Sequence, residues 1–109
     1  MNNQEYKEVE KMTYHEYCDY LQNKYGKAKY DYMNENFVKN PKVTRTKEGL
    51  FVHHIMEDKV GDISKQERAK LYPYEYQKAE NILYCDYLEH LLLHILISEE
   101  TREERQIPG

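Results

Sequence analysis

The chain lacks tryptophan, has only two cysteines and contains no long hydrophobic run. Cys18 and Cys85 lie far apart and neither belongs to a Cys-x-x-Cys pair, so we expect two reduced, partly buried thiols rather than a disulfide scaffold or a zinc knuckle. A membrane span needs about 18 consecutive apolar residues, and residues 1–5 have neither the basic nor the apolar region of a signal peptide. We therefore expect a cytoplasmic protein.

The chain also lacks a surplus of positive charge. Its formal net charge of -4 argues against a protein that coats nucleic acid by electrostatics alone. The segment from Lys24 to Lys47 is an exception, because its lysines and arginine are opposed only by Asp31 and Glu35. This basic segment is either ordinary solvated surface or a surface that faces phosphate.

Tyrosine is abundant, with 12 residues among 109. A chain of this length predicts one domain with one modest core, and tyrosine suits a shallow core or an interface where the hydroxyl stays wet. Thr13 to Glu16 has the form of a capping box, so a helix is expected to begin there. The helically spaced Tyr14, Tyr17, Leu21 and Tyr25 indicate packing in the core or against a partner, including a second copy of the chain.

Other elements follow from local signals. We expect a frayed start over residues 1–10, a short helix over 27–36, and extended chain over 43–46 and 49–54. Further signals predict a short helix opened by a capping box at Ser64 to Glu67, a strand over 82–85, and a final helix to about Glu104 capped by Asp86 and Glu89. The expected buried stripe of that final helix consists of Leu88, Leu91, Leu92, Ile95 and Leu96.

Four of the five histidines lie in two short apolar segments. On a helix, His90 and His94 share one face and can reach a single point in space. On a strand, His53 and His54 point to opposite faces, so one is expected to be a third metal ligand and the other to be free to act as a base. Three histidine ligands leave a coordination position open for water or substrate, as in catalytic sites.

These residues resemble the HNH family of nucleases, also called the His-Me finger or ββα-metal family. The resemblance is carried by the His53-His54-Ile55 segment, by Asn81, and by the spacing from Asn81 to His90 and His94. It implies that His53, His90 and His94 bind one divalent ion (Zn²⁺, Ni²⁺, Mn²⁺ or Mg²⁺), that His54 is the general base, and that Asn81 holds the intervening loop. The implied fold is α+β: a ββα-metal core in residues 41–109, ending in a long C-terminal helix, with a Tyr-rich N-terminal helical extension in residues 1–40 packed on it.

The resemblance implies a small phage or mobile-element endonuclease that hydrolyses phosphodiester bonds of DNA, or less readily of RNA. Arg45 and then Lys47 are the candidates for contacting phosphate. Where many relatives carry glycine or proline, this chain has Glu57 and Asp58, which either contact the metal or repel phosphate. The alternative is a non-catalytic binding protein on the same scaffold, such as an anti-defence inhibitor that grips a host protein. We expect a monomer or a homodimer that has no membrane partner.

Overall fold

The computed structural model describes residues 2–106 and is a small mixed α+β domain. Its regular elements are α1 (Asn3–Val9), α2 (Tyr14–Tyr25), β1 (Phe51–His54), α3 (Gln66–Ala69), β2 (Ile82–Cys85) and α4 (Tyr87–Gln106). Short 3-10 helices lie between them, namely η1 (Pro41–Val43), η2 (Thr46–Glu48), η3 (Ile55–Asp58), η4 (Tyr74–Gln77) and η5 (Ala79–Asn81). Among the helices of the described residues, none has the length and apolar character needed to cross a membrane.

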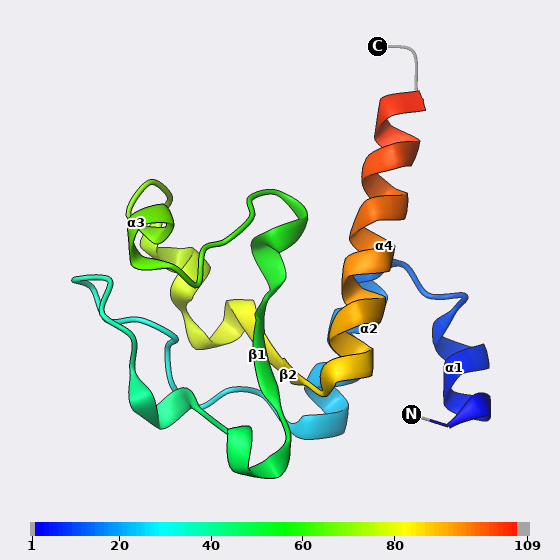
Figure 1. The fold of residues 1–109 in the computed structure, drawn as a ribbon, viewed down its shortest axis with the longest axis horizontal. Helices are drawn as coiled ribbons and strands as arrows, with labels where there is room; N and C mark the ends of the chain where they lie inside the picture. Colours follow the sequence, from blue (N-terminus) through cyan, green and yellow to red (C-terminus); the bar gives the residue numbers. More distant parts are fainter. Residues whose placement is uncertain (1, 107–109) are drawn as a thin grey trace.

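The two strands pair antiparallel and divide the molecule into two halves. Helices α2 and α4 lie on one side of the sheet, and α3 lies with the irregular segments on the other (Figure 1). His53 pairs with Leu83, and His54 pairs with Ile82. Because directly paired side chains share a face of the sheet, His53 faces the helices and His54 faces the irregular segments. The predicted separation of the two histidines is confirmed by this register.

Helix α2 begins where its capping box predicts. The Thr13 hydroxyl accepts from the N–H of Glu16, and the Glu16 carboxylate accepts from the N–H of Thr13. Tyr14, Tyr17 and Leu21 are buried against β2 and α4. The prediction of core packing is therefore confirmed, because the chain itself covers these residues.

Helix α4 begins with the predicted reciprocal cap. Glu89 N–H donates to Asp86, and Asp86 N–H donates to Glu89, each at 2.8 Å. The predicted buried stripe is wrong in part: Leu92 and Leu96 are buried, but Leu88, Leu91 and Ile95 are exposed. Helix α4 turns a different face to the core from the one predicted, because Glu89 is fully buried. The buried Glu89 carboxylate accepts hydrogen bonds from Lys24 and Tyr25.

Several other local predictions are wrong. Residues 1–10 contain helix α1, held by the buried Val9. Residues 27–36 are not helical, because the Asn34 side chain accepts from nearby backbone N–H groups and Tyr32 N–H donates to Gln77 O. Residues 43–46 are not extended, and α3 begins at Gln66 without a side-chain cap from Ser64. Both free cysteines are buried, as predicted.

Candidate metal centre

Three of the predicted ligands converge at the end of β1. His53 reaches the helix side of the sheet from β1, and His90 and His94 project from successive turns of α4. The ring centroids of His53 and His90 are 5.4 Å apart, those of His53 and His94 are 5.6 Å apart, and those of His90 and His94 are 4.7 Å apart. The sequence therefore predicted correctly which three histidines lie together.

A fourth group, Glu57, joins them. It lies on η3, four residues after His53, and its Oε2 is 3.7 Å from His53 Nδ1 and 3.4 Å from His94 Nε2. The Nε2 atoms of His90 and His94 are 3.1 Å apart, and one ligand atom from each of the four residues lies within 4.8 Å of the others. Tetrahedral ligands at about 2.0–2.2 Å from zinc are separated by about 3.3–3.6 Å, so these groups nearly have the spacing of a tetrahedral site.

The orientation of His53 is set by Tyr14. The Tyr14 hydroxyl donates to Ile55 O at 2.7 Å, so at its 2.8 Å contact with His53 Nε2 it accepts the ring proton. His53 Nδ1 then carries the lone pair, and this buried atom has no hydrogen-bond partner within the part of the chain that the structure describes. A buried, unprotonated nitrogen aimed at the cluster fits a metal ligand.

The titration behaviour of the cluster also suits a cation. Burial lowers the pKa of His53 well below its usual value, and the neighbouring His90 and His94 lower it further. Burial, and then His94, lower the pKa of His90. Burial raises the pKa of Glu57 to about 7, with a smaller contribution from Asp62. The imidazoles of His53 and His90 are therefore neutral at pH 7, which is the form that can bind a metal ion.

His54 lies outside this cluster. It is 1% exposed, its ring contacts Tyr32 edge to face with centroids 4.5 Å apart, and its Nε2 is 2.8 Å from Gln77 Oε1. Gln77 Nε2 donates to Ile63 O, so Oε1 is an acceptor and His54 Nε2 is the protonated nitrogen. Burial lowers the pKa of His54, and the Gln77 contact opposes this shift. His54 is thus a neutral base with its lone pair on Nδ1, but it is not free as predicted, because protein covers it.

The remaining predicted site residues lie elsewhere. Asn81 donates from its side chain to Glu75 O at 2.8 Å and so joins two parts of the segment between the strands. Arg45 contacts Glu48 and stacks on the ring of Tyr84. Tyr84 packs on the face of the sheet opposite His53, so Arg45 lies on that face as well. Lys47 is exposed on η2. Neither basic residue belongs to the ligand cluster.

A cleft of about 280 Å³ is lined by Phe51 and Val52 of β1 and by residues of both regions. His90 lines one part of it, and Lys39 and Arg45 line another. Ser64 and Tyr32 also contribute to its wall. A ligand in this cleft would contact both basic side chains and one residue of the metal cluster.

Two residues with a part in this site, Tyr14 and Gln77, were not predicted to contact the histidines. Tyr14 belongs to a buried stripe, a pattern that indicates packing and not a hydrogen bond to His53. No sequence pattern distinguishes Gln77 from the surrounding polar residues. Glu57 was expected either to contact the metal or to repel phosphate, and the structure places it beside His53 and His94. Comparisons with protein-family models, with curated proteins and with solved structures give no match to this chain.

Proposed function

We propose that this protein is a metal-dependent nuclease that hydrolyses phosphodiester bonds, with DNA as the favoured substrate. The observation that carries the proposal is that His53 Nδ1, which has no hydrogen-bond partner among residues 2–106, faces Glu57, His90 and His94. The order strand, strand, helix, with ligands from β1 and α4, supports a ββα-metal arrangement of the HNH type. A divalent ion bound there would polarise a phosphodiester and stabilise the leaving oxygen.

The chain's own groups have separate roles in this proposal. His53, His90 and His94 hold the ion together with Glu57. Lys39 and Arg45 attract the phosphate backbone into the cleft that His90 also lines. Asn81 holds the segment between the strands through Glu75 O.

His54 is the general base of the proposal. Gln77 holds the protonated Nε2, which leaves Nδ1 to accept the proton of the attacking water. Since His54 is almost fully covered, water reaches it only when Tyr32, which also lines the cleft, moves aside. Substrate in the cleft would favour that movement.

The test is cleavage of supercoiled plasmid, single-stranded DNA and RNA with Mg²⁺, Mn²⁺, Ni²⁺ or Zn²⁺. We expect divalent-metal-dependent cleavage that His54→Ala and His94→Ala each reduce by at least about a hundredfold, the lower range for a lost acid–base group. Leu91→Ala, an exposed position beside His90, is the matched control and should cleave like the wild type. Absence of cleavage of every substrate with every ion would refute the proposal.

One observation favours the alternative of a non-catalytic binding protein. Tyr6, Leu88, Leu91 and Ile95 are exposed and line an apolar cleft of about 380 Å³ between α1 and α4. Rows of exposed apolar side chains are typical of protein interfaces. A stoichiometric host protein that is retained by the His54→Ala variant and released by Leu91→Asp would favour this function over catalysis.

A further inference from the structure

A second group of ligand-type side chains lies outside the metal cluster. His15 comes from α2, Asp58 from η3 and Glu100 from α4. One ligand atom from each of these residues lies within 4.8 Å of the other two, and His15 Nε2 is 3.1 Å from Asp58 Oδ2. Three elements that are distant in the sequence therefore bring an imidazole and two carboxylates to one place.

The two carboxylates are incompletely satisfied. The Asp58 side chain is only 2% exposed, yet its Oδ1 has no hydrogen-bond partner within the described residues. Glu100 Oε2 is likewise buried and without a partner there. Removing a carboxylate from water costs several kcal/mol unless a hydrogen bond or an opposite charge replaces the water. His15 alone supplies one contact to one oxygen.

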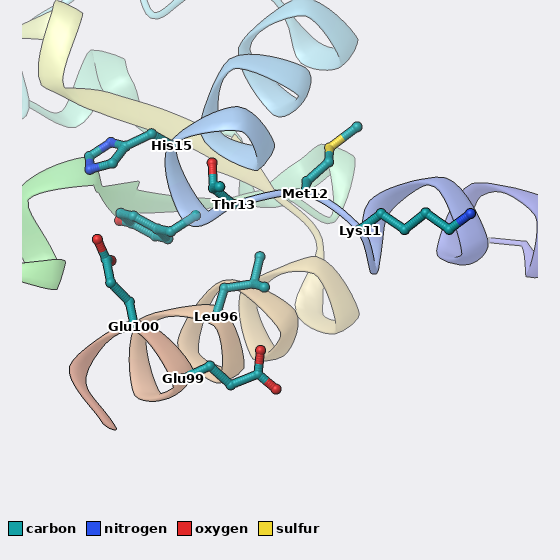
Figure 2. A pocket seen from close by; sticks show the side chains of 8 residues that line it. Lys11, Met12, Thr13, His15, Leu96, Glu99 and Glu100 are labelled. Carbon is teal, nitrogen blue, oxygen red and sulfur yellow. The ribbon is translucent and has the colours of Figure 1, made fainter. Parts of the chain in front are cut away.

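The space beside two of these groups, His15 and Glu100, is large enough for an ion and its waters. A pocket of about 310 Å³ is lined by His15 and Glu100, among other residues. Glu100 rises from α4 toward His15, whereas Lys11 extends away from both (Figure 2). Lys11, although it lines the same pocket, thus does not supply the missing positive charge.

We propose that His15, Asp58 and Glu100 form a second divalent-cation site, which takes an ion of the Mn²⁺ or Zn²⁺ class. Carboxylates suit Mn²⁺ and imidazole suits Zn²⁺, so a mixed set of one imidazole and two carboxylates accepts both. His15 is largely exposed, so water completes the coordination sphere. This site does not depend on nuclease activity.

The second site is distinct from the first. Glu100 follows His94 by six positions, which is about 9 Å along a helix axis, whereas the ions of two-metal catalytic centres are about 3.5–4 Å apart. Its role is therefore structural. Adjacent residues link the sites, since Tyr14 precedes His15 and Glu57 precedes Asp58. An ion that ties α2, η3 and α4 together would hold Tyr14 and Glu57 in place around His53.

The test is equilibrium dialysis of the full chain against Zn²⁺ and, separately, Mn²⁺, followed by elemental analysis. We expect two Zn²⁺ per wild-type chain, and one each for Asp58→Asn and Glu100→Gln. The double variant His90→Ala, His94→Ala should also retain one ion, which the further substitution Glu100→Gln removes. Mn²⁺ should be retained by the same double variant.

Glu99→Gln is the matched control, because Glu99 is exposed on the same turn of α4 and, although it lines the same pocket, lies outside the ligand group. It should bind two Zn²⁺ like the wild type. Circular dichroism verifies folding, and Glu100→Gln decides the result if Asp58→Asn does not fold. A His90→Ala, His94→Ala variant that binds no ion, or a folded Glu100→Gln variant that binds as many Zn²⁺ as the wild type, would overturn the proposal.

Discussion

Tyr14→Phe tests whether the hydroxyl of Tyr14 prepares His53 for a metal ion. The hydroxyl accepts from His53 Nε2 at 2.8 Å and donates to Ile55 O at 2.7 Å, and burial raises the pKa of Tyr14, so it stays protonated. Without it, the His53 proton is free to move to Nδ1, which removes the lone pair from the cluster. Loss of such an orienting partner typically lowers metal affinity by about 10–100-fold, or about 1.4–2.7 kcal/mol.

The assay is competition for Zn²⁺ against a chromophoric chelator at pH 7.5. It uses a Glu100→Gln background so that only the cluster around His53 is titrated. Tyr17→Phe is the control, because Tyr17 lies in the same helix and its buried hydroxyl has no hydrogen-bond partner within the described residues. The control should bind Zn²⁺ like the parent. Equal affinity in Tyr14→Phe and Tyr17→Phe would refute the role of Tyr14.

Three further substitutions test the packing and charge of the fold. Leu93 is fully buried, so Leu93→Ala should lower the free energy of unfolding, measured by urea denaturation, by about 2–5 kcal/mol. Leu91 is exposed, so Leu91→Ala should change the same quantity by less than about 0.5 kcal/mol. Glu89→Ala should cost about 2–3 kcal/mol by the same measurement, because it leaves Lys24 without its buried partner. Burial raises the pKa of Glu57 from 4.5 to about 7, so the stability it contributes is fully present below pH 4.5 and lost as the pH rises through 7. Between pH 4.5 and about pH 8, the free energy of unfolding of metal-free Glu57→Gln should therefore rise relative to that of the wild type by at most about 3 kcal/mol. A difference in unfolding free energy that does not change with pH would contradict the burial of a protonated carboxyl.

The ligand histidines were predictable because their spacing matches the geometry of their elements. His90 and His94 are one helical turn apart, and a strand necessarily sends His53 and His54 to opposite faces. The reciprocal cap at Asp86 and the short strand before it were also recognisable, because both depend on local chemistry.

The unpredicted parts depend on long-range contacts. The face that α4 buries is decided by Glu89, whose local pattern indicates a surface cap but whose partners Lys24 and Tyr25 come from α2. The segment 27–36 has helical spacing, yet Gln77 and local asparagine side chains take its hydrogen bonds. Arg45 lines the cleft, but Glu48 and the Tyr84 ring hold it on the face of the sheet opposite His53, away from the ligand cluster.

The central claim is that His53, Glu57, His90 and His94 bind one divalent ion. The most direct measurement is anomalous diffraction at the zinc absorption edge from crystals grown with Zn²⁺. We predict a peak about 2.0–2.2 Å from His53 Nδ1, from the Nε2 atoms of both helical histidines and from a Glu57 oxygen. A crystal grown with Zn²⁺ that shows no peak at this position, or in which His53 Nδ1 is turned away from the ion, would contradict the account.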